Sequence, residues 1–120
     1  MSAVAEVIQR LAANLRGCRG AFTMDYDGLP LEVVRPPSGG TDLDAIGAEM
    51  ATVLREARQA ALDLDLGPLT GMSVRAGGPT LVFQDCGRDF LLAAVVDRAS
   101  SAMVARRALA QAVRDLPTSP

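Results

Sequence analysis

The spacing of apolar residues predicts three amphipathic helices. Apolar side chains recur every three or four positions in residues 3–16, 42–64 and 100–116, which is the period of a helix with one buried face. Thr41 is a good N-cap for the second helix, and Asp44 completes a capping-box pattern. At ~1.5 Å per residue this helix is roughly 33 Å long, so we expect it to extend past its own sheet. The predicted inward residues of the third helix are Ala105, Leu109, Val113 and Leu116.

Five further segments have the pattern of β-strands. They are residues 21–24, 29–34, 70–76, 80–85 and 90–96. Met72 and Val74 alternate with polar residues, which indicates a strand with one buried face. The last segment is apolar at every position, as expected for a central strand that is buried on both faces. Short connections imply an antiparallel sheet with helices packed on it, an α+β fold.

The length and the turn residues indicate how the chain is organised. Because a typical domain has roughly 100–150 residues, we expect a single domain over residues 1–116 and a disordered tail at residues 117–120. The Pro-Pro-Ser-Gly-Gly sequence of residues 36–40 predicts a loop. Turns are predicted at residues 77–79 and 86–89.

The composition excludes several kinds of chemistry. The sequence has no histidine, and all twelve of its basic residues are arginine. This excludes Ser-His-Asp and Cys-His catalysis, zinc sites with histidine, Schiff-base chemistry and the P-loop lysine. A net charge of −2 and scattered arginines do not fit a nucleic-acid-binding protein. We therefore expect no cofactor and no bound metal.

The cysteines and the apolar runs indicate a cytoplasmic protein. Cys18 and Cys86 are too few for a secreted disulfide scaffold, so we interpret both as buried thiols. Polar residues interrupt the apolar run at the N-terminus, which does not fit a signal peptide. Because no apolar run approaches the ~20 residues of a membrane span, we expect no membrane insertion.

The sequence Asp25-Tyr26-Asp27-Gly28 admits two interpretations. Phosphohydrolases of the haloacid-dehalogenase type carry Asp-x-Asp-Gly after a strand, where one aspartate attacks phosphorus and the other acts as acid and base. Asp25 and Asp27 have this spacing, but the sequence has no lysine and no second acidic pair after a later strand. The alternative is a hairpin turn, in which Asp25 and Asp27 bond the backbone and Gly28 adopts a positive φ. We favour the turn.

Three charged residues of the second helix also admit two interpretations. Arg55, Glu56 and Arg58 form either a solvated face or part of a surface that contacts a partner. We favour the solvated face and keep the partner surface as the alternative.

These features together resemble the roadblock/dynein light chain family, which includes bacterial MglB-like proteins. The resemblance is carried by "GCRGAFTMDYDGLPLEVV", by the long helix from Asp42, and by three closing strands that end in "FLLAAVVD" before a last helix. It implies a five-stranded antiparallel sheet in the order 2-1-5-4-3. It also implies three layers, with the long helix on one face and the two terminal helices on the other.

The resemblance further implies a homodimer that forms through the long helix and the third strand. Pairing of an exposed strand edge is a common way for two copies to associate. The expected interface residues are Ile46, Met50, Val53, Leu54, Ala57, Met72 and Val74. Family members bind Ras-like small GTPases, so the resemblance implies a non-enzymatic GTPase regulator or scaffold in a bacterial signalling, polarity or motility system. The alternatives are a dimeric adaptor for a sensor kinase or another signalling protein, and phosphohydrolase chemistry at Asp25 and Asp27.

Overall fold

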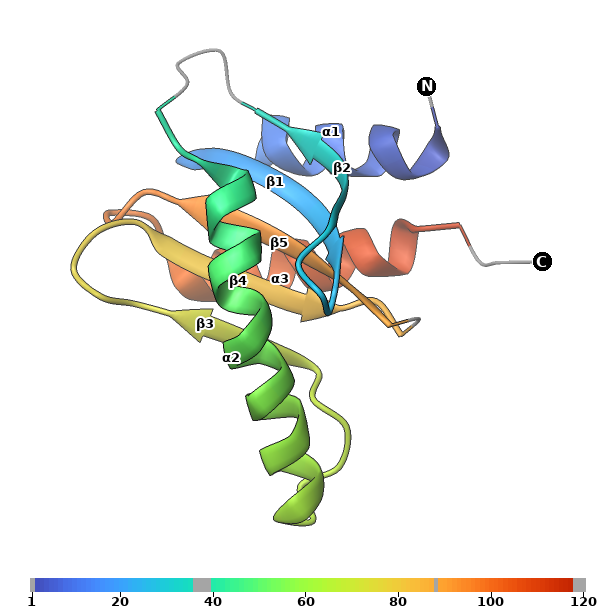
Figure 1. The fold of residues 1–120 in the computed structure, drawn as a ribbon. Helices are drawn as coiled ribbons and strands as arrows, with labels where there is room; N and C mark the ends of the chain where they lie inside the picture. The colour runs from blue at the N-terminus through green and yellow to red at the C-terminus, as the bar shows by residue number, and fades with distance from the viewer. Residues whose placement is uncertain (1, 36–39, 88, 118–120) are drawn as a thin grey trace.

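The computed structural model describes residues 2–35, 40–87 and 89–117 (Figure 1). Within them, every predicted helix and strand is present in the predicted order. In that order they are α1 (Ala3–Asn14), β1 (Cys18–Asp25), β2 (Pro30–Val34), α2 (Leu43–Asp63), β3 (Gly71–Val74), β4 (Thr80–Asp85), β5 (Phe90–Val96) and α3 (Ala102–Asp115). Residues 36–39 of the predicted loop, Arg88 of a predicted turn and residues 118–120 of the predicted tail lie outside the described residues.

The boundaries differ from the prediction where tertiary pairing decides them. β1 begins at Cys18 rather than at residue 21, because Cys18 pairs with Val96 across a register shift. β3 ends at Val74, since its pairing with β4 stops where Val74 meets Leu81. The predicted N-cap of α2 is wrong: Asp42, not Thr41, accepts a hydrogen bond from the backbone N–H of Ala45 at 3.0 Å.

The sheet has the strand order β2-β1-β5-β4-β3. Every neighbouring pair of strands is antiparallel, which confirms the expected topology. β5 lies in the centre and is buried along nearly its whole length, as its continuous apolar sequence predicts. β2 and β3 form the two edges.

Helices cover both faces of the sheet, which gives three layers. α1 and α3 lie on one face and α2 crosses the other (Figure 1). One hydrophobic cluster lies under α1 and α3, with Ile8, Leu11, Ala21, Val82, Leu92, Val96 and Leu109 among its members. A second lies under α2, with Phe22, Met24, Leu43, Leu54, Phe83, Leu91 and Val95 among its members.

The core contacts of α3 differ partly from the prediction. Ala105 and Leu109 are fully buried, as predicted. Ala112 completes the buried face, whereas Val113 and Leu116 are only partly buried. The difference arises because the buried stripe of α3 follows positions 105, 109 and 112, at the regular helical spacing of four and three.

The long helix α2 is attached to the sheet mainly through its first half. Its buried residues are Leu43, Gly47, Ala51 and Leu54, and none lies nearer its C-terminus. With 21 residues it is about 32 Å long. Its last turns extend past the edge of the sheet, and the segment that leads to β3 returns beside them (Figure 1). The expected extension beyond the sheet is therefore present.

Both cysteines are free and half-buried, beside the cluster under α1 and α3. Burial is the main cause that raises the pKa of the Cys18 thiol. Burial and the nearby carboxylate of Asp85 raise the pKa of Cys86 to about 12. Both thiols therefore stay protonated near neutral pH, which makes them weak nucleophiles. Among the described helices, none is both long and apolar enough to cross a membrane.

Candidate interaction surface

The structure places Asp25, Asp27 and Gly28 in the turn between β1 and β2. The Asp25 carboxylate oxygen Oδ1 accepts hydrogen bonds from the backbone N–H groups of Asp27 at 2.9 Å and Leu29 at 3.0 Å. Gly28 has a φ of 86°, which a residue with a side chain rarely adopts. A Cβ atom at Gly28 would lie 3.1 Å from the backbone oxygen of Gly47, so the turn packs closely against α2.

This geometry argues against a phosphohydrolase. Oδ1 of Asp25, which would have to attack phosphorus, is already held by two backbone N–H groups. The sheet is antiparallel, whereas phosphohydrolases of the haloacid-dehalogenase type have a parallel sheet. Among the residues that the structure describes, no three His, Cys, Asp or Glu side chains are grouped so as to hold a metal ion.

Tyr26 connects this turn to the turn between β4 and β5. Its ring is buried, and its hydroxyl donates a hydrogen bond to the carboxylate of Asp85. Burial is the largest of the effects that raise the pKa of the phenol. The hydrogen bond to Asp85 and the negative charge of that carboxylate raise the pKa further. Two turns that lie 59 residues apart in the sequence are thereby joined.

Two arginines of α2 contact these two turns, the one after β1 and the one after β4. The Arg58 guanidinium lies 4.2 Å from the centre of the Tyr26 ring, within the range of a cation–π contact, and forms an ion pair with Asp89 at 2.9 Å. Arg55 donates a hydrogen bond to the backbone oxygen of Tyr26 at 2.6 Å. Arg55 and Arg58 therefore have intramolecular partners, while Glu56 between them is exposed to solvent. Sequence analysis did not predict this cluster.

Replacing Tyr26 with phenylalanine is expected to lower the free energy of unfolding at pH 7 by about 1–3 kcal/mol, because Oδ2 of Asp85 loses its donor while Oδ1 keeps the N–H of Gly87. The folded protein raises the pKa of this phenol above its usual value of 10.0, so it favours the protonated form. The stabilisation by Tyr26 is therefore present below pH 10 and lost as the pH rises further. Urea unfolding at pH 7 and above pH 10 should show a difference between the two proteins that narrows with pH.

The single tyrosine of the sequence makes a direct check possible. Phenolate absorbance reports Tyr26 alone, and its titration should lie at higher pH in the folded than in the urea-unfolded protein. Equal titration curves in the two states would contradict the prediction.

The predicted interface residues of α2 divide into two groups. Ile46, Met50 and Ala57 are partly buried and Val53 is 45% exposed. With the exposed Ala60 they form one flank of the helix, which we call the α2 stripe (Ile46, Met50, Val53, Ala57 and Ala60). Leu54 is fully buried in the core under α2. Its placement in the interface is a correction to the prediction: it supports α2 from beneath and has no surface to offer a partner.

Two exposed leucines continue this apolar surface past the end of α2. Leu64 and Leu66 are 68% and 74% exposed, and we call them the leucine tip. Leu62 is 50% exposed but lies on the opposite flank of α2, about 160° around the helix from Ile46. The backbone holds them in place: Asp65 has a φ of 58°, and the N–H of Leu66 bonds the oxygen of Ala61 at 2.8 Å, as in a Schellman cap. The alternation "LDLDLG" contains the signal for this tip, but without the fold it cannot be told from an ordinary helix end.

The apolar side chains of the edge strand β3 face the same side of the sheet as α2. Met72 packs against the core under α2, and Val74, two residues on, is half-buried on the same side of the strand. β3 pairs with β4 on one side only, so its other side offers unpaired backbone groups. The α2 stripe, the leucine tip and β3 together make an apolar surface bordered by an open strand edge.

Comparisons with known proteins agree on the fold. A family model described as Roadblock/LC7 domain matches residues 4–97. A Roadblock/LC7 domain of Streptomyces avermitilis is similar with a TM-score of 0.79 and 20% identity, covering 92% of this chain and 91% of that chain. MglB of Myxococcus xanthus has a TM-score of 0.82 and 14% identity, covering 96% and 92%. MglC of the same organism has a TM-score of 0.67 and 19% identity, covering 94% and 95%. None of the curated proteins matches the sequence significantly.

Proposed function

Because this chain belongs to the Roadblock/LC7 domain family, we propose that it is a homodimeric, non-enzymatic regulator or scaffold that binds a Ras-like small GTPase in the bacterial cytoplasm. The observation that carries the proposal is the apolar surface made by the α2 stripe, the leucine tip and β3. Large apolar side chains exposed together mark an interaction site.

A second copy of the chain fits this surface. A twofold axis beside β3 would pair the open edge with its mate and bring the two α2 stripes together. Ala57 and Ala60 allow two helices to approach closely, since each has only a methyl group. The leucine tip extends past its own sheet, so a second copy would cover leucines that no strand of the same chain covers. Similarity to a solved MglB with a tetrameric arrangement supports self-association.

The GTPase is expected to bind on the outer surface of α2. Glu56 is exposed there, between two arginines that hold the turns. Arg55 and Arg58 would have to break these contacts to reach a nucleotide. An effect on GTP hydrolysis would therefore come from the way the regulator shapes the GTPase, not from either of these arginines. This part of the proposal rests on family membership and on similarity to MglB and MglC.

Retention of a purified Ras-like GTPase from the same genome tests the proposal. The immobilised protein is expected to retain the GTPase loaded with a non-hydrolysable GTP analogue and not the GDP form. Glu56→Arg is expected to weaken retention at least fivefold, because it reverses an exposed charge on α2. Glu6→Arg, the same change on the opposite face, is the control and should leave retention unchanged.

The remaining outcomes separate the alternatives. Retention with an unchanged rate of GTP hydrolysis supports a scaffold. Retention with faster hydrolysis supports an activator. If the immobilised protein retains neither the GTP-analogue form nor the GDP form of the GTPase, the GTPase proposal is wrong. That result would favour an adaptor for a sensor kinase or another signalling protein.

A further inference from the structure

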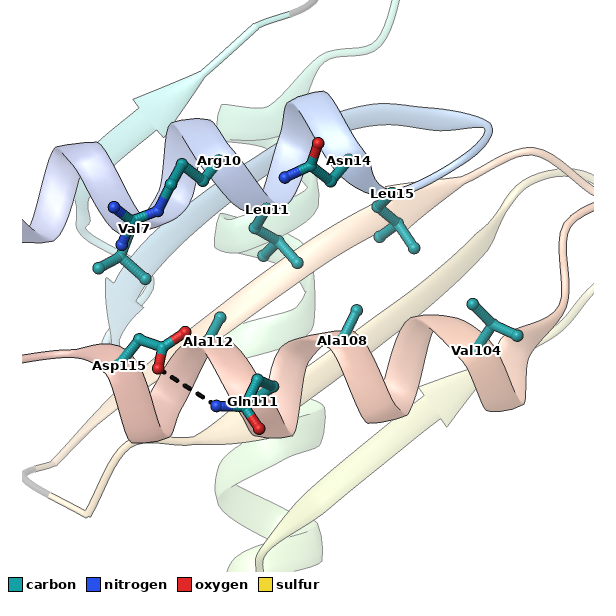
Figure 2. A pocket seen from close by; sticks show the side chains of 10 residues that line it. All are labelled: Val7, Arg10, Leu11, Asn14, Leu15, Val104, Ala108, Gln111, Ala112 and Asp115. Carbon is teal, nitrogen blue, oxygen red and sulfur yellow. Dashed lines mark hydrogen bonds between the residues drawn. The ribbon is translucent and has the colours of Figure 1, made fainter.

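The face opposite α2 carries a hollow between α1 and α3. Figure 2 shows Leu11 and Leu15 of α1 pointing toward α3, with Val104, Ala108 and Ala112 of α3 facing them. The cavity has a volume of about 290 Å³. We call it the α1–α3 groove. The small side chains of Ala108 and Ala112 leave this space between the two helices.

The apolar residues that line the groove differ in exposure, because Leu11, Leu15 and Ala112 are buried at its base. Val104 is 55% exposed although it lines the groove. At the end where α3 begins, Leu15 and Val104 also line a second hollow beside Arg16 and Ser101, so the apolar lining continues to the start of α3. The lining residues run from Val7 to Leu15 on α1 and from Val104 to Asp115 on α3, so the groove is roughly 12–17 Å long. This length matches two to three turns of a guest helix.

Three arginines lie in or beside the groove. Arg10 of α1 lines it directly, while Arg107 and Arg114 lie on α3 outside the lining. On α3, Arg114 donates to the Gln111 side chain at 2.9 Å, and Arg107 lies one turn from both Val104 and Gln111. Asp115 is the acidic residue of the lining, and it accepts a hydrogen bond from Gln111 at 3.2 Å (Figure 2).

The charge of this face differs in sign from the rest of the chain. Residues 2–16 and 101–116 contain five arginines and two carboxylates, a net charge of +3. The whole chain has a net charge of −2, so the remaining residues carry −5. A partner with negative charge is therefore attracted to the α1–α3 face and repelled by the other surfaces.

We propose that the α1–α3 groove binds an acidic amphipathic helix of a partner protein. The apolar side of the guest would fill the groove, and its carboxylates would face Arg10, Arg107 and Arg114. A lipid surface fits less well, because apolar residues that insert into a bilayer protrude, whereas these line a hollow. The site lies on the other side of the sheet from the proposed dimer and GTPase surface, so the protein has two independent binding faces.

Two designed peptides of 14 residues test the proposal. Both carry leucine at positions i, i+4, i+7 and i+11, with glutamate at the polar positions of one and lysine at those of the other. Fluorescence anisotropy should show the glutamate peptide binding at least tenfold more tightly, with a salt-dependent affinity. Ala108→Glu, which fills and charges the groove, should weaken its binding at least tenfold. Met103→Glu adds the same side chain at an exposed position of α3 outside the groove and should have no effect.

A second pair of variants tests the arginines without changing the base of the groove. Arg10→Glu/Arg107→Glu should reverse the preference toward the lysine peptide. Arg75→Glu/Arg98→Glu changes the net charge equally at exposed positions outside α1 and α3 and should not. Equal affinity for both peptides, failure of either to bind at millimolar concentration, or insensitivity to Ala108→Glu would overturn the proposal. So would co-sedimentation with phosphatidylglycerol vesicles that is lost in Arg10→Glu/Arg107→Glu, since it would identify a membrane as the ligand.

Discussion

The variant Val53→Glu/Ala60→Glu is expected to be a monomer under conditions in which the unchanged protein is a dimer. In a twofold interface each substitution occurs twice, so four carboxylates would be brought together in an apolar contact. Burying such charges without partners costs far more than the contact supplies. Multi-angle light scattering at micromolar concentration should give about 25 kDa, twice the 12.5 kDa of one chain, for the unchanged protein. The variant should give half of that mass.

These two positions separate association from folding. Val53 and Ala60 are exposed, whereas Met50 packs against the core, so a charge at Met50 would also unfold the protein. Thr52→Glu/Gln59→Glu is the matched control. It adds the same two charges at the preceding residues, which lie on the outer face of α2. A monomeric mass for the unchanged protein, or an unchanged mass for Val53→Glu/Ala60→Glu, would refute the proposed interface.

Replacing Leu54 with alanine is expected to lower the free energy of unfolding by about 2–5 kcal/mol. Leu54 is fully buried among large side chains that include Phe22 and Phe83. Truncation removes buried methyl groups and leaves a cavity that rigid neighbours fill only in part. Because the last buried residue of α2 is Leu54, its loss also weakens the attachment of the helix. Urea unfolding followed by circular dichroism measures the effect.

The neighbouring residue supplies the control for Leu54. Val53→Ala removes apolar atoms from an exposed position, so the fold of one chain should lose less than about 0.5 kcal/mol. Dimerisation makes apparent stability depend on concentration. Both variants should therefore be compared in the Val53→Glu/Ala60→Glu background or at several protein concentrations. Equal losses for Leu54→Ala and Val53→Ala would contradict the burial of Leu54.

Sequence patterns predicted the elements of this fold because each pattern reports on local burial. The continuous apolar run of β5 is typical of a short strand covered on both faces, and the periodic stripe of α2 is typical of a helix with one buried face. The strand order came from the family resemblance, since periodicity does not say which strands are neighbours. The sequence pattern also did not distinguish the buried Leu54 from the exposed Val53. Both belong to an apolar stripe, and the side of it that faces the sheet depends on how α2 crosses β1.

The side-chain clusters could not be predicted for a different reason. The bond between Tyr26 and Asp85 joins residues that only the pairing of β1 with β5 and of β5 with β4 brings together. The role of Arg58 depends on the same pairing, because it contacts Tyr26 and Asp89 at once. The leucine tip has a visible sequence, but its exposure follows from the length of α2 relative to the sheet. The Tyr26–Asp85 bond, the contacts of Arg58 and the exposure of the leucine tip all depend on the tertiary structure and not on a local segment.

Because β5 is buried on both faces, adjacent residues of this strand pack under different helices. Leu92, Ala94 and Val96 pack beneath α1 and α3, while Leu91, Ala93 and Val95 pack beneath α2. The parity of the residue number therefore decides which binding face a β5 side chain supports. Leu91 lies under the surface proposed for the dimer and Leu92 under the side of the molecule with the α1–α3 groove. Two leucines joined by one peptide bond thus support opposite sides of the molecule.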